Sequence, residues 1–385
     1  MNTIQWAYTC IDCSANYESS ETRWKCDCGG LLEWPVPGAP TTLRSPGASG
    51  LWRYSWLLPP TRSQNQLVLG ESSTPLLDSE RFGAKLKLDF LLPSGSYKDR
   101  GAAIMVSRLL DQGVKSITLD SSGNAGAAVA TYCAAAGIAC DVFVPYNNSP
   151  GKLAQISAVG GALRRVHGSR ADTSVAARQS SEANFYASHN WSADFGAGLS
   201  TVAIELFEQL GHQAPTSVLA PCGNGGVILG LHRGFTSLVK GGHIDKVPRL
   251  IAVQSSAFDA VSNAFGQGLA EVEPRGEGGI TVAEGIASTL PVRGRQLLEA
   301  VRQSQGAVIT VSEGEIANAA IELASSGVYV EPTGAVGIAG LRQLQRNAAQ
   351  VLLGDSPVVM LTGSGLKAGS KVAEMKNPNW LLGDG

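Results

Sequence analysis

The sequence lacks a stretch that could cross a membrane. No uncharged apolar run reaches the roughly 18 residues that a transmembrane helix needs, and residues 1–9 lack the basic start and long apolar core of a secretory signal. Charge is also sparse: 16% of the 385 residues are charged, and the net charge is −2. This composition gives no bulk attraction to nucleic acid or to an anionic membrane. We therefore expect a cytoplasmic protein with neither as a partner.

Two common phosphate-binding patterns are absent as well. No G-x-G-x-x-G follows a strand-like run, and no G-x-x-x-x-G-K-[ST] occurs, which argues against a dinucleotide fold and a nucleoside-triphosphate loop. Internal repeats and low-complexity tracts are not found either. Glycine is instead abundant, with 46 residues, and 44% of the chain is hydrophobic. A chain of this length and composition is expected to bury sizeable, tightly packed cores.

From about residue 50 onward, strand-like runs alternate with helical patterns. Such alternation predicts an α/β fold built on open parallel sheets. Before it, a link rich in proline and glycine, residues 35–47, follows a segment of residues 1–33 that holds four of the seven cysteines. The strand-like runs lie at 116–119, 139–144, 218–220, 250–253, 308–311 and 358–361.

A lysine, Lys98, stands between a Gly/Ser-rich turn and an Ala-rich helical run at 102–110. This pattern places an amine at a helix start, where the positive partial charge of the helix N-terminus favours the neutral form. A lysine must be neutral to form a Schiff base with an aldehyde. The placement therefore makes Lys98 a candidate nucleophile.

Two glycine loops each follow a strand-like run and open a helix. The first, residues 121–126, reads Ser-Ser-Gly-Asn-Ala-Gly, and the second, residues 223–226, reads Gly-Asn-Gly-Gly. Backbone N–H groups at such junctions bind carboxylates or phosphates, and glycine allows the backbone to approach an anion closely. One amine and two anion cradles together indicate a cofactor with an aldehyde and a phosphate, and a substrate with a carboxylate.

The four N-terminal cysteines form two close pairs. A C-x-x-C pair followed twelve residues later by a C-x-C pair fits four thiolates around one structural zinc ion. The second pair is one residue shorter than usual, so a metal-free ribbon and disulfides remain alternatives, although a cytosolic disulfide is disfavoured. The four predicted metal ligands are Cys10, Cys13, Cys26 and Cys28.

Taken in order, these motifs resemble pyridoxal-phosphate enzymes of the tryptophan-synthase-β fold type, most of all the threonine synthase branch. The matching stretches cover most of the chain and include Leu-Gly-Glu-Ser-Ser-Thr-Pro-Leu at 69–76, Glu-Pro-Thr-Gly at 331–334 and Leu-Thr-Gly-Ser-Gly-Leu-Lys at 361–367. The resemblance implies a homodimer, with the cofactor between two α/β domains and an N-terminal ribbon that is common in this branch. The expected units are a cysteine module at 1–33, a large domain at 34–104 and 191–385, and a small domain at 105–190.

The resemblance also implies a role for each matching site residue. Lys98 would bind pyridoxal phosphate covalently and then move protons at Cα and beyond. Asn124 would contact the phenolic oxygen of the cofactor, and Thr362, or alternatively Ser364, would meet its pyridine nitrogen with a neutral hydroxyl, which suits elimination and replacement. The cofactor phosphate would lie against Gly223, Asn224, Gly225, Gly226 and Val227, and the substrate against Ser122, Gly123, Asn124, Ala125, Gly126 and Glu284.

The particular reaction is less determined. Threonine synthases bind the phosphate of O-phosphohomoserine partly through an arginine and a lysine, and the corresponding positions here hold Phe195 and Ser200, with Asp194 beside them. Losing a bidentate cation and adding a carboxylate weakens binding of a dianion. Ala125 also replaces a common threonine. The open alternatives are a threonine-synthase-like enzyme acting at the β or γ carbon, a serine or threonine dehydratase or ammonia-lyase, a β-replacement synthase of the cysteine or cysteate type, and a degenerate cofactor-binding paralogue.

Several further polar residues are expected near the cleft. The remaining cations that could approach it are Arg53, Arg100, Lys152 and Arg170, and for each of them a solvated or structural position is an equal alternative. The expected pocket liners are Tyr97, His167 and His189.

Overall fold

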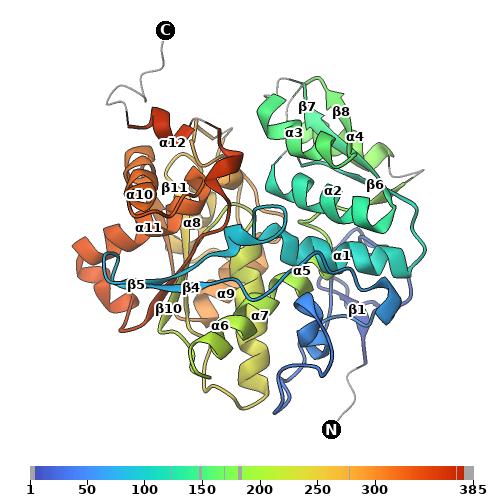
Figure 1. The fold of residues 1–385 in the computed structure, drawn as a ribbon, viewed down its shortest axis with the longest axis horizontal. Helices are drawn as coiled ribbons and strands as arrows, with labels where there is room; N and C mark the ends of the chain where they lie inside the picture. The colour runs from blue at the N-terminus through green and yellow to red at the C-terminus, as the bar shows by residue number, and fades with distance from the viewer. Residues whose placement is uncertain are drawn as a thin grey trace.

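The computed structural model describes residues 5–121, 123–146, 150–168, 170–180, 184–276, 278–369 and 371–376. Three sheets build the molecule (Figure 1). The first belongs to the cysteine module and is antiparallel, with the order β2-β1-β3. Its strands are β1 (Ala7–Cys10), β2 (Asn16–Glu18) and β3 (Leu32–Glu33).

The largest sheet has six strands in the order β12-β11-β10-β13-β5-β4, of which β4 alone runs antiparallel to its neighbour. Every residue of β10 and of β13 is buried, as a parallel sheet covered on both faces requires. The strands are β4 (Leu76–Ser79), β5 (Ala84–Lys87), β10 (Ser217–Pro221), β11 (Arg249–Ser255), β12 (Ala307–Val311) and β13 (Pro357–Met360).

Helices cover both faces of this sheet, and alternate residues of β10 enter the two apolar cores. Val218 and Ala220 pack with α6, α7, α8 and α9, whereas Leu219 packs with α10 and α11, because successive side chains of a strand point to opposite faces. The helices are α6 (Thr201–Gln209), α7 (Gly226–Lys240), α8 (Ala260–Gly266), α9 (Gly294–Gln303), α10 (Glu313–Ser325) and α11 (Pro332–Arg346), and the short α12 (Lys371–Glu374) follows near the end of the chain.

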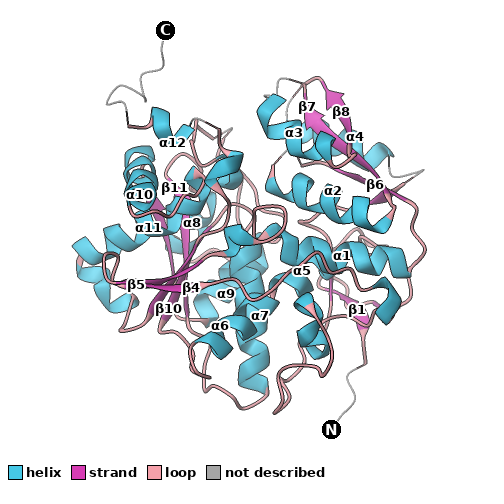
Figure 2. Ribbon diagram, viewed as in Figure 1, coloured by secondary structure: helices cyan, strands magenta, loops and turns pink. Residues whose placement is uncertain are grey.

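The third sheet is fully parallel, with the order β8-β7-β6-β9, and lies beside the larger one (Figure 2). Its apolar core is shared with α1 and with Leu51, Trp52 and Phe195 from outside the sheet segment. Its strands are β6 (Ser116–Leu119), β7 (Ala139–Pro145), β8 (Ala162–Val166) and β9 (Phe185–Tyr186), and its helices are α1 (Lys98–Asp111), α2 (Asn124–Ala136), α3 (Pro150–Ala158) and α4 (Arg170–Gln179).

The two parallel sheets confirm the predicted α/β class, and all six predicted strand-like runs are strands. The short helix α5 (Ala193–Leu199) connects the two halves by packing between α1 and α7. A Cβ atom added at Gly198 would lie 2.1 Å from the carbonyl oxygen of Arg100, so glycine permits backbone contact between α5 and α1 there. No helix within the described residues is both long and apolar enough to cross a membrane.

Candidate active site

Lys98 is the first residue of α1 and is half-buried. Its Nζ atom lies 4.9 Å from the ring centroid of Tyr97 and 5.7 Å from that of Phe195. The next residue, Asp99, is fully buried and accepts a hydrogen bond of 2.8 Å from the backbone N–H of Ser94. Burial raises the pKa of the Asp99 carboxyl to about 7. The amine therefore lies between aromatic rings, as a site that limits water around a reactive lysine would require.

Thr362 is held beside Lys98 by backbone contacts. The N–H of Tyr97 donates to the carbonyl of Thr362 at 2.9 Å, and Ser96 bridges to Gly363. The Oγ1 atom of Thr362 is buried and has no hydrogen-bond partner among the described residues. The hydroxyl of the alternative residue, Ser364, instead accepts a bond from the N–H of Leu366. This difference favours Thr362 for the predicted contact with a ring nitrogen.

Asn124 begins α2, and its side chain reaches across to the large sheet domain. Its Nδ2 atom donates to Oε1 of Glu331 at 2.6 Å, and a Cβ atom added at Gly363 would strike this pair. Burial raises the pKa of the Glu331 carboxyl, against the opposing effects of Lys367 and the bond from Asn124. The sequence assigned no role to Glu331. The residue directly precedes Pro332, at the start of the matching stretch 331–334, and this position was an indication that its carboxylate belongs to the site.

The predicted carboxylate-binding loop connects β6 to α2. A Cβ atom added at Gly126 would lie 1.9 Å from the carbonyl oxygen of Ser121, so only glycine fits this turn. Gly123 precedes the helix as its N-cap, and Ala125 is buried in the first turn. Ser122 lies outside the described residues. The contact of this loop with a substrate remains a prediction.

The predicted phosphate-binding loop connects β10 to α7. Gly225 has φ +74°, a conformation that glycine adopts without strain, and a Cβ atom added at Gly223 would lie 2.8 Å from the backbone of Ile286. The side-chain oxygen of Asn224 accepts from Ser288 at 3.3 Å, and Val227 is buried in the first turn of α7. A Cβ atom at Gly226 would lie 3.8 Å from the Tyr97 hydroxyl, so the loop adjoins the residue before Lys98.

Two cations that were expected near the cleft belong instead to a buried ion cluster. Arg53 donates to Glu205 at 2.6 Å, and Arg100 bridges Glu205 and Asp89 at 3.0 and 2.8 Å. Lys87 also pairs with Glu205. Burial alone would raise the pKa of the Glu205 carboxyl, but Arg100 and Lys87 outweigh it and hold the pKa well below its ordinary value. For Arg53 and Arg100 the structure bears out the alternative of a structural cation, because compensating carboxylates distant in sequence hold both arginines in the interior.

The segment around Phe195 contributes an apolar side chain near Lys98. Phe195 is buried, with its ring 5.8 Å from that of His189, so an apolar ring occupies the position at which the resemblance implies a cation. Asp194 was expected to add charge beside it, and this was wrong. Its carboxylate accepts hydrogen bonds from Tyr8 of the cysteine module at 3.4 Å and from Trp34, directly after β3, at 2.7 Å, and it lies 3.6 Å from Arg108 of α1.

The other expected site residues are spread out. Glu284 is exposed and pairs with Lys371 near the C-terminal helix, and its contact with substrate stays a prediction. His167 is exposed and stacks on Tyr146 at 4.1 Å. Ser200 is buried and donates to the Ala197 carbonyl. The side chains of Lys152 and Arg170 lie outside what the structure describes.

The four N-terminal cysteines converge in the small antiparallel module. All four sulfur atoms lie within 4.8 Å of one another, and the closest approaches are 3.5 Å from Cys13 to Cys26 and 3.6 Å from Cys10 to Cys28. A Cβ atom added at Gly30 would lie 2.9 Å from the sulfur of Cys10, so the turn must be tight. Four thiols at these separations form a group that one metal ion could bridge.

These elements define an α/β enzyme with a lysine at a helix start, a glycine loop suited to an anion and a buried, unpartnered threonine hydroxyl beside the lysine. Residues 67–363 match the model of the pyridoxal-phosphate dependent enzyme family, and the chain belongs to that family. It is 31% identical to threonine synthase of Methanocaldococcus jannaschii over 376 residues, covering 93% of this chain and 92% of that protein. It is also 31% identical to threonine synthase of Mycobacterium tuberculosis over 350 residues, covering 85% and 91%.

Solved structures agree on the fold. A threonine deaminase from T.th. superposes with a TM-score of 0.66 at 26% identity, covering 76% of this chain and 92% of that one. Maize serine racemase superposes with a TM-score of 0.68 at 22% identity, covering 79% and 92%. The protein is thus a pyridoxal-phosphate-dependent, threonine-synthase-like enzyme.

The residues present fit this cofactor. The buried, unpartnered hydroxyl of Thr362 offers a neutral contact for a ring nitrogen, and the loop of Gly223 to Gly226 leaves backbone N–H groups open to a phosphate at the start of α7. Lys98 is linked to Thr362 through the Tyr97 backbone. The predicted cofactor-binding residues therefore come from four separate segments, those of Lys98, Asn124, the loop 223–227 and Thr362, which the fold brings close to one another.

Proposed function

We propose that the enzyme catalyses elimination and replacement at the β or γ carbon of a small amino acid, with conversion of O-phosphohomoserine to threonine as the best named reaction. The observation that carries the proposal is the unpartnered Thr362 hydroxyl beside Lys98. A neutral partner leaves the ring nitrogen largely unprotonated, which suits elimination and replacement. Threonine synthases at 30–31% identity over most of the chain support the named reaction.

The chain's own groups then have distinct tasks. Bound pyridoxal phosphate supplies an electron sink for charge that develops at the substrate Cα. The amine of Lys98 removes and returns protons at Cα and at the neighbouring carbon. Backbone N–H groups of residues 123–126 would hold the substrate carboxylate, while Asn124, whose side chain bonds to Glu331, would contact the phenolic oxygen of the cofactor. The rings of Tyr97 and Phe195 limit water around the amine.

A second function is favoured by the surroundings of Phe195. An apolar ring 5.7 Å from Nζ of Lys98 suits an unphosphorylated side chain better than a dianion. The alternatives are therefore a serine or threonine dehydratase or ammonia-lyase, or a β-replacement synthase.

Product analysis separates these reactions. The holoenzyme should be incubated separately with O-phosphohomoserine, O-acetylserine, serine and threonine. Stoichiometric threonine and phosphate from the first substrate support threonine synthesis. Oxo acid and ammonia from serine or threonine support the dehydratase, and turnover of O-acetylserine in the presence of a thiol or sulfite supports the synthase. Turnover of none of the four contradicts the proposal.

Lys98→Ala tests the cofactor assignment independently of the substrate. The variant should lose the visible absorbance band of the lysine-bound cofactor and all turnover. Lys246→Ala, at an exposed lysine on the surface, should keep both. A band of full strength in Lys98→Ala would show that another group binds the cofactor.

We also propose that the cysteine module binds one structural zinc ion through Cys10, Cys13, Cys26 and Cys28, supported by their mutual approach within 4.8 Å. Metal analysis should find about one zinc per chain, lost in a Cys10→Ser, Cys13→Ser double variant and retained in Cys140→Ala. A well-folded, metal-free wild type would contradict it. A homodimer, inferred from the family, is testable by sedimentation of the holoenzyme.

A further inference from the structure

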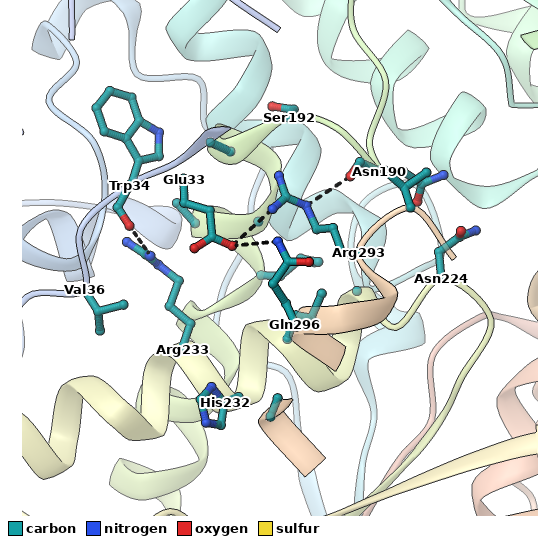
Figure 3. Close-up of a pocket in the computed structure, with 18 of the residues that line it drawn as sticks. Glu33, Trp34, Val36, Asn190, Ser192, Asn224, His232, Arg233, Arg293 and Gln296 are labelled. Atoms are coloured by element: carbon teal, nitrogen blue, oxygen red, sulfur yellow. Dashed lines mark hydrogen bonds and ion pairs between the residues drawn. The ribbon is translucent and has the colours of Figure 1, made fainter. Parts of the chain in front are cut away.

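A cavity of about 260 Å³ lies between the cysteine module and the large sheet domain (Figure 3). Its wall is formed by the segment that follows β3, the loop before α5, one side of α7, and α9 with the residues that precede it. Asn224 and Gly226 of the phosphate loop belong to the lining, whereas Lys98 and Thr362 do not. The cavity thus shares two residues with the predicted phosphate loop but does not include Lys98 in its lining.

Two arginines and two glutamates line this cavity, but only one glutamate compensates the arginines. Arg293 lies 3.2 Å from Oε1 of Glu33, which also accepts a bond from Gln296 at 3.3 Å. Figure 3 shows Glu33 turned toward Arg293 and Gln296, with Arg233 on the other side of Glu33. Glu299 is exposed and forms no ion pair within the described residues. The Glu33 carboxylate therefore pairs with Arg293, and no ion pair joins it to Arg233 within the described residues.

Arg233 is the cation without an anion of its own. Its Nη atoms donate to the carbonyls of Trp34 and Pro35 at 2.8 and 2.5 Å. Its Nε atom is buried and has no acceptor within the described part of the chain. Burial lowers the pKa of the Arg233 guanidinium to about 10, with Glu33 opposing the shift. Arg233 is partly buried, and a guanidinium that has lost part of its hydration without forming an ion pair binds an incoming carboxylate favourably.

The rest of the lining includes neutral polar groups. His232, Gln303 and Asn190 contribute hydrogen-bonding atoms, and burial lowers the pKa of His232, which keeps its ring neutral. Such groups match the remaining polar atoms of a small metabolite without adding charge.

We propose that this cavity is a binding site for a small organic carboxylate, held by Arg233 with Arg293 nearby and separate from the substrate site. Because Asn224 and Gly226 line the cavity and also form the predicted phosphate loop, a ligand there contacts the element that holds the cofactor. A metabolite bound in this cavity would therefore change the affinity of the enzyme for its cofactor.

Succinate is a suitable probe because it has carboxylates but no amine to react at Lys98. Calorimetric titration of the holoenzyme at constant ionic strength should show saturable binding of succinate, and none of its neutral isostere succinamide. Arg233→Gln should raise the dissociation constant at least tenfold. Because that change also loosens contacts to the module, Thr236→Trp serves as a second variant: it fills the cavity from the next turn of α7 without touching those carbonyls.

Binding that persists in both variants, or that is equal for succinamide, would overturn the proposal, as would no saturable heat in the wild type. Gly126→Ala, whose added Cβ would lie 1.9 Å from the Ser121 carbonyl oxygen and so distort the backbone of the substrate-carboxylate loop, distinguishes the cavity from that loop. Succinate affinity should survive that change, and its selective loss there would move the ligand to the catalytic site and refute the inference. None of these measurements depends on turnover, so their outcome is independent of the reaction proposed above.

Discussion

Asp99, the buried carboxyl next to Lys98, should make the stability of the enzyme fall as pH rises. Burial raises its pKa from 3.8 to about 7 in the folded state. Between these values the folded protein keeps a proton that the unfolded chain has released. The stabilising contribution of the protonated group is complete below about pH 4 and is lost as pH rises toward 7.

The magnitude follows from the width of that interval. Each pH unit corresponds to about 1.4 kcal/mol, so a rise from about pH 5 to 7 removes about 3 kcal/mol of unfolding free energy through this one group. Asp99→Asn keeps an oxygen that can accept the Ser94 N–H but cannot ionise. The unfolding free energy of Asp99→Asn minus that of wild type should therefore be about 3 kcal/mol larger at pH 8 than at pH 5.

Urea unfolding followed by tryptophan fluorescence, at saturating cofactor and at both pH values, measures this difference. Asp355→Asn, at an exposed carboxylate, is the matched control and should track the wild type. If Asp99→Asn and wild type lost stability in parallel between pH 5 and 8, the folded-state proton on Asp99 would not exist and the reasoning would fail.

Three further changes test packing, charge and cofactor contacts. Gly198→Ala should lower the unfolding free energy by about 3 kcal/mol or more, because its Cβ atom would lie 2.1 Å from backbone. Gly196→Ala on the same helix adds a Cβ atom that meets nothing within 4 Å, so it should be neutral or stabilising. Urea unfolding measures both. Glu205→Gln should cost about 3–5 kcal/mol in the same assay because it strands buried cations, and a cost below about 1 kcal/mol would contradict the cluster. Glu331→Leu should weaken cofactor binding about tenfold in an absorbance titration, because it removes the acceptor for the Asn124 amide. Glu331→Gln keeps an acceptor oxygen and should retain most of the affinity. Equal dissociation constants for Glu331→Leu and wild type would contradict this role of Glu331.

Sequence patterns alone specified the α/β class, the strand positions and the place of Lys98. These features depend on short-range signals: an apolar run, a glycine turn and a helical segment adjacent in the chain specify a strand–loop–helix unit locally. The run at 116–119 is β6 residue for residue, and the two glycine loops stand at the starts of α2 and α7. Family resemblance added the cofactor, which the match over residues 67–363 confirms.

Long-range packing, by contrast, determined which charged and polar groups face the site. Glu331 meets Asn124 across 207 residues of sequence, and Arg100 meets Glu205 across 105. The Asp194 carboxylate lies against Trp34 and Arg108 because the Trp34 N–H and the Arg108 guanidinium stabilise its charge. A charge is placed by the partners that packing brings to it, since burying it alone is costly. Local sequence does not encode those partners, so the isolated Thr362 hydroxyl and the uncompensated Arg233 emerged only from the folded chain.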